Sequence, residues 1–196
     1  MTESLPRLLL RLSEAGEPAD LLGRPCLTAA ETSVFDQWLR RGLLIEQPAA
    51  TCWDPCPTCD CEADDRPIRW RGDAPYAACR LGPARDTVLA ADDLATFRIM
   101  PAALAREIAE ATGLPGPVTP VLPGVWHLGE LQPQLPVVVA FARGTLQAPG
   151  LVAALRAANP RGRVILLGPA MSAVERGRWA EAEIHTATAT ARREIQ

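Results

Sequence analysis

The chain has 196 residues, of which 48% are hydrophobic and 22% charged, so it can bury a globular core and is not disordered throughout. No apolar run reaches the roughly 18 residues of a membrane-spanning helix, and the charged N-terminus is unlike a secretory signal peptide. The net charge is −3 and neither half of the chain is basic, which argues against a broad electrostatic grip on nucleic acid. We therefore expect a cytoplasmic protein with no membrane partner.

All twenty basic residues are arginine, because the sequence contains no lysine. A P-loop needs a lysine on the phosphates, a PLP enzyme needs a Schiff-base lysine, and the usual nuclease triplet needs one as well. These three enzyme classes are excluded in their standard form. The two histidines and one tyrosine also leave few general bases or nucleophiles, so we do not expect catalysis.

Residues 1–50 form the first of three predicted segments, and they read as helical. A first helix is indicated by leucines at helical spacing, Leu5, Leu8, Leu9 and Leu12. Thr28 and Glu31 have the spacing of a capping box, which opens a second helix. The apolar face of this second helix consists of Val34, Phe35, Trp38 and Leu39. The helix is expected to end at Arg41–Gly42 and to continue into a strand over residues 43–46.

The stretch SVFDQWLRRGLLIEQ resembles the recognition helix and first wing strand of winged-helix proteins. This resemblance covers about 45 residues and rests on an apolar-faced helix that ends in Arg-Gly-Leu-Leu. It implies an outer, DNA-contacting face made of Ser33, Asp36, Gln37, Arg40 and Arg41. The alternative is an ordinary helical hairpin that packs on the next domain.

Residues 51–85 form a second segment, rich in Cys, Pro and Asp. Its Cys56-Pro57-Thr58-Cys59 resembles the knuckle of zinc ribbons and rubredoxins, in which a tight turn directs two sulfurs at one tetrahedral ion. Those families usually place Gly after the second cysteine, where this chain has Asp60, and usually supply a second knuckle. Here only Cys79 follows. A hairpin of strands over 67–71 and 75–79 would return Cys79 to the knuckle.

Three of the expected ligands of a structural zinc ion are therefore Cys56, Cys59 and Cys79. The fourth is Cys52 or Cys61, and Cys52 is preferred because Cys61 is only one residue from Cys59. Four thiolates would leave zinc no open position, so the ion would stabilise the fold and perform no chemistry. Disulfides, free thiols or an iron–sulfur centre are the alternatives. The sixth cysteine, Cys26, has an apolar context and is expected to be a buried free thiol.

The same segment contains arginines next to aromatic residues. Alternation along a strand puts Arg69 and Arg71 on one face, with Ile68 and Trp70 on the other. With Arg40 and Arg41 they are candidates for a phosphate-facing patch. Nearby acids offer the alternative of a solvated, salt-bridged face.

Residues 86–196 form the third segment, in which helices and strands alternate. Helices are predicted over 101–112, 148–158 and 172–182, the first between Pro101 and Gly113 and the last opened by a Ser172–Glu175 capping box. Strands are predicted over 125–131, 136–143, 164–167 and 184–190. A βαβ unit within a mixed sheet follows from this order.

The element order from 101 to 168 resembles part of the restriction-endonuclease core. This resemblance would place Glu107 or Glu110 on the first helix, Glu130 at a strand end and Arg143 after the next strand. The Asp of that family is missing and its Lys would be an Arg, so such a site would bind metal poorly. His127 is expected to be a packed strand residue, and His185 has no evident partner.

The sequence thus predicts an α+β protein: a winged-helix-like unit over 1–50, a zinc-ribbon-like module over 51–85 and an α/β domain over 86–196. The expected function is a noncatalytic, zinc-stabilised DNA-binding or regulatory protein, of the kind found in bacterial regulators or in accessory proteins of mobile elements and defence systems. The α/β domain would serve partner binding or self-association. The alternatives are a protein–protein adaptor and a nuclease-like enzyme or its degenerate relative.

Overall fold

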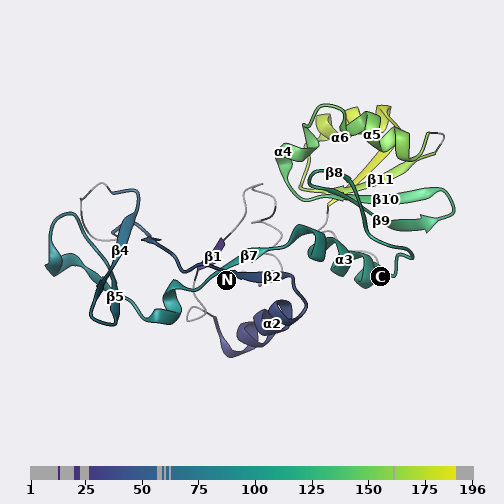
Figure 1. Cartoon of the computed structure of the whole chain (residues 1–196). Coiled ribbons are helices and arrows are strands. Elements are labelled where there is room, and N and C mark those ends of the chain that lie inside the picture. The colour runs from purple at the N-terminus through teal and green to yellow at the C-terminus, as the bar shows by residue number, and fades with distance from the viewer. Residues whose placement is uncertain are drawn as a thin grey trace. The chain divides into compact units, whose positions relative to one another are not determined.

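The computed structural model describes residue 13 and residues 20–22, 27–56, 59, 61, 63–160 and 162–188. Helices and sheets are both present, which confirms the α+β class in that general form (Figure 1). The chain divides into two compact units. One comprises Asp20–Gln37 and Leu44–Arg98, and the other includes Trp38–Leu43 and the chain from Ile99 onward. The predicted helix at Leu5–Leu12 and the thiol of Cys26 lie outside the described residues.

Helix α2 (Ala29–Arg40) begins at the predicted capping box. The backbone amide of Glu31 donates to Thr28 Oγ1 at 3.3 Å, and the amide of Thr28 donates to Glu31 Oε2 at 2.9 Å. These bonds satisfy amides that the first helical turn leaves free. The helix ends at Gly42, whose positive φ of 70° lets the amide of Leu43 donate back to the carbonyl of Trp38 at 2.9 Å.

Three strands form a small sheet in the order β1-β7-β2. They are β1 (Asp20–Leu22), β2 (Leu44–Gln47) and β7 (Thr96–Ile99). Phe35 of α2 packs edge-on against Phe97 of β7, with ring centroids 4.8 Å apart, and both rings are buried. This aromatic contact fixes the apolar face of α2 on the sheet.

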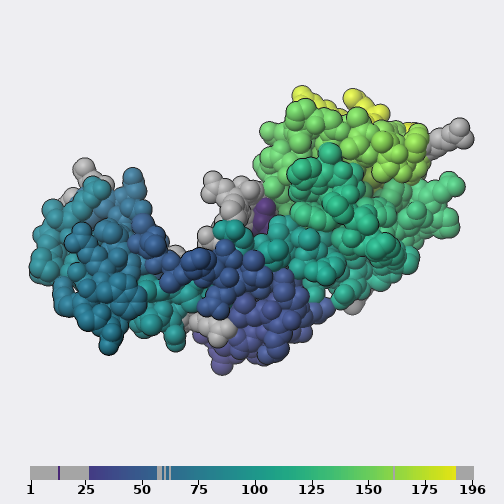
Figure 2. Space-filling view, viewed as in Figure 1, coloured from purple at the N-terminus to yellow at the C-terminus, as the bar shows by residue number. Residues whose placement is uncertain are grey.

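A second sheet of the same unit has the order β3-β4-β5-β6. Its strands are β3 (Cys52–Trp53), β4 (Arg66–Arg71), β5 (Ala74–Ala77) and β6 (Thr87–Val88). The predicted hairpin is present, because Arg71 pairs with Ala74 across the Gly72–Asp73 turn. This sheet buries a small core of Ala77, Leu89 and Leu94, against which Trp53 and Ile68 pack. Figure 2 shows the surface of this part of the chain in blue to teal.

The segment between β2 and β7 leaves and re-enters the three-stranded sheet at one place. Strands β2 and β7 are hydrogen-bonded neighbours, although about fifty residues separate them in sequence. Two further bonds join the ends of the segment: Ala50 N donates to Leu94 O at 2.9 Å, and Thr96 Oγ1 donates to Pro48 O at 2.9 Å. The β3–β6 sheet is therefore carried on a closed loop. We call residues 48–95 the inserted module.

The other unit is built on a five-stranded sheet in the order β12-β11-β10-β9-β8. Its strands are β8 (Thr119–Leu122), β9 (Val125–Gln132), β10 (Leu135–Ala140), β11 (Val164–Gly168) and β12 (Ile184–Thr188). Strands β10, β11 and β12 run parallel to one another, whereas β9 pairs in antiparallel fashion with both of its neighbours, β8 and β10. The predicted βαβ unit in a mixed sheet is thus present.

Four helices accompany this sheet: α3 (Pro101–Thr112), α4 (Arg143–Leu146), α5 (Leu151–Ala158) and α6 (Ala173–Glu181). Figure 1 shows α4, α5 and α6 on one side of the sheet. Helix α3 has the predicted bounds, since it begins at Pro101 and ends before Gly113, which adopts a left-handed conformation. The core of the unit joins Val138 and Leu166 of the sheet to Leu151, Leu155 and Trp179 of the helices.

Candidate metal centre

Four cysteine sulfurs gather at one end of the inserted module. The Sγ atoms of Cys56, Cys59, Cys61 and Cys79 all lie within 4.8 Å of one another. The Sγ atoms of Cys59 and Cys79 are 3.6 Å apart. All four side chains are free thiols, without a disulfide bond. Cys79 is buried and the other three are half-buried.

Strand pairing brings these cysteines together from separate parts of the module. Cys56 follows β3, which is held against β4 by the pairing of Trp53 with Arg66. Cys59 and Cys61 belong to the connection between those strands. Cys79 comes two residues after β5, the return strand of the hairpin. The hairpin therefore brings Cys79 close to the cysteines of the β3–β4 connection, as expected from the sequence.

The backbone around Cys79 forms a turn that suits a metal-bound sulfur. The amide of Leu81 donates to Cys79 Sγ at 3.4 Å, and the amide of Gly82 donates to Cys79 O at 3.2 Å. The amide of Cys79 itself donates to Asp86 Oδ1 at 2.9 Å. Amide donors to sulfur stabilise a thiolate ligand and fix its orientation.

The spacing of the sulfurs fits a tetrahedral metal ion. Zinc–thiolate bonds of about 2.3 Å place the sulfurs of a tetrahedral site about 3.8 Å apart. The Cys59–Cys79 separation is close to this value, and because all the sulfurs lie within 4.8 Å of one another, only a small contraction is needed. A donor set of four soft thiolates suits zinc or iron and disfavours magnesium or calcium.

Crowding makes the four thiols unequal as acids. Partial burial, assisted by hydrogen bonds that the protonated Cys56 thiol donates to neighbouring sulfurs, raises the pKa of Cys56 to about 12. The Cys61 thiol lowers the pKa of Cys59 by hydrogen bonding to it. The cluster therefore resists carrying four thiolates without a cation, and a bound metal ion would supply the compensating charge.

Cys52, the fourth ligand preferred from the sequence, does not lie with the other four cysteines. Pairing with Pro67 holds it in β3, where its side chain is exposed and its sulfur lies 4.0 Å from Thr51 Oγ1. It is not a member of the sulfur group. Cys61, the alternative, completes the four instead, so the single intervening residue does not prevent Cys59 and Cys61 from facing one point.

The residues predicted to contact nucleic acid have mixed environments. Gln37 and Arg40 are exposed on α2, and Arg69 is exposed on β4. Arg41, in contrast, binds two carboxylates of α3, with Nε 2.7 Å from Glu107 and Nη2 2.8 Å from Glu110. Part of the predicted patch is thus engaged in contacts within the chain.

Arg71 is also engaged. Its Cζ lies 4.6 Å from the centroid of the Tyr76 ring, and its Nη2 lies 3.4 Å from Asp86 Oδ2. The other oxygen of Asp86 accepts the amide of Cys79. Arg71 is therefore linked through one carboxylate to Cys79 of the cysteine cluster.

The residues of the nuclease-like hypothesis lie in separate contacts. Glu107 and Glu110 hold Arg41. Glu130 accepts the amide of Gln134 at 3.2 Å, and Arg143 donates to the carbonyl of Ala170 at 2.6 Å. Sequence reasoning did not foresee that Glu130 and His127 both line a groove of about 710 Å³ beside β8. A β-bulge next to Gly129, whose φ is 137°, shifts the strand register so that His127 and Glu130 share one face. This glycine is the sequence feature that could have indicated the shared face.

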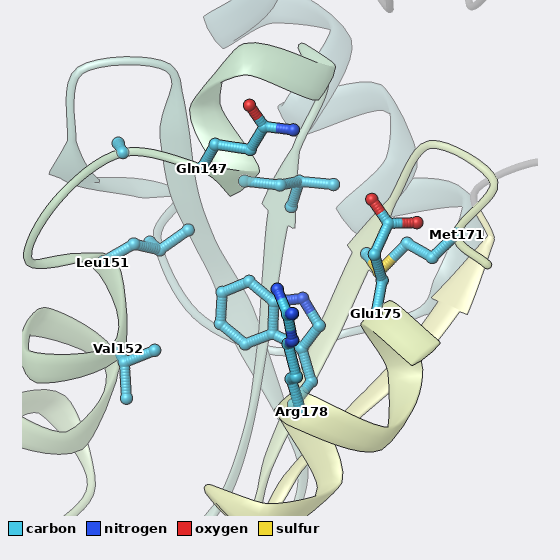
Figure 3. Close-up of a pocket in the computed structure, with 9 residues that line it drawn as sticks. Gln147, Leu151, Val152, Met171, Glu175 and Arg178 are labelled. Carbon is cyan, nitrogen blue, oxygen red and sulfur yellow. The ribbon is translucent and has the colours of Figure 1, made fainter. Parts of the chain in front are cut away.

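A further cavity of about 410 Å³ lies between α5 and α6 (Figure 3). Its lining is mostly apolar and includes Leu151, Val152 and Met171, with Gln147, Glu175 and Arg178 as polar members. Glu175 is already bound, because its Oε2 accepts the amide of Ser172 at 2.7 Å. His185, on β12, is exposed.

No helix in the described part of the chain is both long and apolar enough to cross a bilayer. Comparison of the sequence with protein-family models and curated proteins, and of the structure with solved structures, finds no match for this chain.

Proposed function

We propose that this chain is a noncatalytic binding protein in which a structural zinc ion, held by Cys56, Cys59, Cys61 and Cys79, stabilises the inserted module. The observation that carries the proposal is the group of four free thiols within 4.8 Å of one another. Four thiolates fill a tetrahedral coordination sphere, so no position is left for a reacting water or substrate. Five free cysteines among the described residues suit a reducing compartment, which supports a cytoplasmic location.

The size of the module explains why it would need a metal ion. Its buried core is centred on Ala77, Leu89 and Leu94, which bury little apolar surface. Segments of this size usually require a metal, a disulfide or a partner to hold a fold. Zinc would join the β3–β4 connection to the end of β5, so metal binding and folding of the module would be coupled.

DNA is the proposed partner of the exposed polar residues. Gln37, Arg40 and Arg69 are exposed, and an arginine or glutamine side chain can bind phosphates or base edges. Titration of labelled duplex DNA at several salt concentrations tests this. Specific contacts would give binding that weakens steeply with salt, and Arg69→Ala would reduce the salt slope by about 1. If the unmodified chain and the Arg69→Ala variant bind DNA equally at every salt concentration, the proposed contact of Arg69 with DNA is contradicted.

A protein–protein adaptor is the second candidate. It is favoured by the ion pairs that occupy Arg41 and Arg71, since these arginines are less free to bind phosphate. The module also exposes Trp70 by 56%, and tryptophan is enriched among the residues that contribute most to protein interfaces. Retention of a protein partner without any DNA binding would favour this candidate.

The metal proposal is tested by elemental analysis of the purified full chain beside its Cys56→Ser variant. We expect about one equivalent of zinc in the unmodified chain and loss of zinc in the variant. Disulfide formation or a stoichiometric iron content in the unmodified chain would contradict a zinc centre. The near-ultraviolet charge-transfer bands of the cobalt-substituted protein would report the number of thiolates bound.

A further inference from the structure

Arg66 is the buried charge of the inserted module. It is the first residue of β4, and its relative exposure is 2%. No other charged residue in the described part of the chain is classed as buried. Removing a guanidinium from water is strongly unfavourable unless hydrogen bonds and an opposite charge compensate for it.

The hydrogen bonds of Arg66 position the guanidinium but do not neutralise it. Nε donates to the backbone carbonyl of Asp54 at 2.7 Å, and Nη1 donates to Thr87 Oγ1 at 2.7 Å. Both acceptors are uncharged groups. The side chain thus joins the end of β3 to β6, and its hydrogen bonds within the described part of the chain leave its positive charge unbalanced.

The cysteine cluster is the partner that can balance this charge. Asp54, whose carbonyl binds Arg66, is two residues before Cys56 in sequence. The bond from Nε to the Asp54 carbonyl therefore holds the guanidinium beside the backbone that leads to Cys56. Four thiols that bind a divalent ion release four protons and form a centre with a net charge of about −2. A buried cation beside such a centre offsets part of that excess charge.

We infer that Arg66 is the counter-ion of the metal centre and that its bond to Asp54 also positions the backbone that leads to Cys56. This inference rests on the proposed metal centre. It specifies the ligand chemistry of the site as a divalent ion with all four cysteines deprotonated, because that anionic form gains most from the arginine. Arg66 is a positioning residue, since it acts on the metal through the cysteines.

Three variants of the full chain separate charge from packing. Arg66→Met removes the charge and keeps much of the side-chain length, Arg66→Lys keeps the charge, and Arg69→Met is the matched control on the exposed part of the same strand. Zinc affinity is measured by competition with a chromophoric chelator. Cobalt substitution then reports the thiolate coordination of each variant.

We expect Arg66→Met to weaken zinc binding by about 10- to 100-fold, the range found when residues next to metal ligands are removed. Arg66→Lys should recover most of the affinity, and Arg69→Met should bind zinc like the unmodified chain. Equal affinity in Arg66→Met and Arg69→Met would overturn the inference. Equal losses in Arg66→Met and Arg66→Lys would overturn it as well, because packing alone would then explain the effect.

The outcome for the unmodified chain distinguishes this inference from the metal proposal. A chain that binds no zinc or cobalt would overturn the metal centre and the counter-ion together. A chain that binds zinc while tolerating Arg66→Met would overturn the counter-ion alone. If Arg66→Met does not fold, Arg66→Lys decides: zinc affinity near that of the unmodified chain supports the charge role, and a large loss contradicts it.

Discussion

Arg41 forms a salt bridge with Glu107, in which Arg41 Nε lies 2.7 Å from Glu107 Oε1. Glu110, one helical turn further along α3, binds the same guanidinium at 2.8 Å. Arg41 comes directly after α2, and both acids come from α3. An arginine that the sequence assigns to a DNA-contacting face thus binds two carboxylates of α3.

Double-mutant analysis of Arg41→Ala and Glu107→Ala should reveal this contact as a coupling energy. We expect about 0.3–1 kcal/mol, because Arg41 is 41% exposed and solvent screens the pair. Urea unfolding of the two single variants and the double variant measures it. Arg40→Ala, which removes the neighbouring exposed arginine, is the control and should show no coupling to Glu107→Ala. Strict additivity at Arg41 would mean that the pair contributes nothing to stability.

The choice between Cys52 and Cys61 as fourth ligand can be tested by single substitutions. Cys61→Ser should reduce zinc content and thermal stability, since Cys61 belongs to the sulfur group. Cys52→Ser should leave both unchanged, because Cys52 is exposed on β3. Elemental analysis and thermal unfolding provide the readout. The reverse pattern would restore Cys52, the ligand preferred from the sequence.

The Phe35–Phe97 contact should be the main anchor of α2. Phe35→Ala removes a ring that is 3% exposed, and we expect it to cost about 3–5 kcal/mol of unfolding free energy. Val88→Ala, at a residue that is 77% exposed, should change stability by less than about 0.5 kcal/mol. Chemical denaturation followed by circular dichroism compares the two. A similar small effect at both positions would show that α2 is held by other contacts.

Two glycines of the α/β unit should respond to alanine in opposite directions. A Cβ atom at Gly129 would lie 2.4 Å from the carbonyl oxygen of Pro115, and its φ of 137° is unsuited to alanine, so Gly129→Ala should be destabilising. At Gly177, inside α6, nothing lies within 4 Å of the added atom. Gly177→Ala should stabilise the protein by about 0.5–1 kcal/mol through helix propensity. Thermal unfolding gives both signs.

The capping box of α6 should make stability depend on pH in the acidic range. Hydrogen bonds from the amide and hydroxyl of Ser172, in that order, hold the pKa of Glu175 below its usual value. A lowered pKa in the folded state stabilises the protein above the unfolded pKa of about 4.3, and this contribution is lost as the pH falls through the folded pKa. Comparing unfolding free energies of the unmodified chain and Glu175→Gln from pH 7 to pH 3 measures it. The difference should shrink on acidification, and a constant difference would contradict this origin.

Local signals in the sequence predicted the starts of α2, α3 and α6, whereas the short helix α4 was not predicted. Pro101 and Gly113 bound α3, and the Thr28–Glu31 and Ser172–Glu175 pairs open α2 and α6, because capping is determined within a few residues. Buried strands such as β11 were likewise indicated by short apolar runs bounded by glycine.

Strands that depend on distant partners were missed. Strand β8 lies in a proline-rich stretch that predicts turns, yet it forms the edge of the sheet, where Pro120 can be accommodated. Strand β7 has only four residues and is defined by its pairing with β1 and β2. The sequence preferred Cys52 over Cys61 as the fourth ligand, whereas the sulfur that lies with those of Cys56, Cys59 and Cys79 is that of Cys61. Cysteine spacing alone does not determine which sulfurs come together.

The inserted module begins after β2 and ends before β7, which are adjacent strands. A hydrogen bond between the amide of Ala50 and the carbonyl of Leu94 joins its two ends. Any segment inserted between these two strands must meet only one condition, which is that its two ends lie close together. Recombination could therefore delete, exchange or transplant the cysteine-bearing piece while the host sheet keeps its strand pairing. Binding specificity carried by that piece could then evolve separately from the scaffold that presents it.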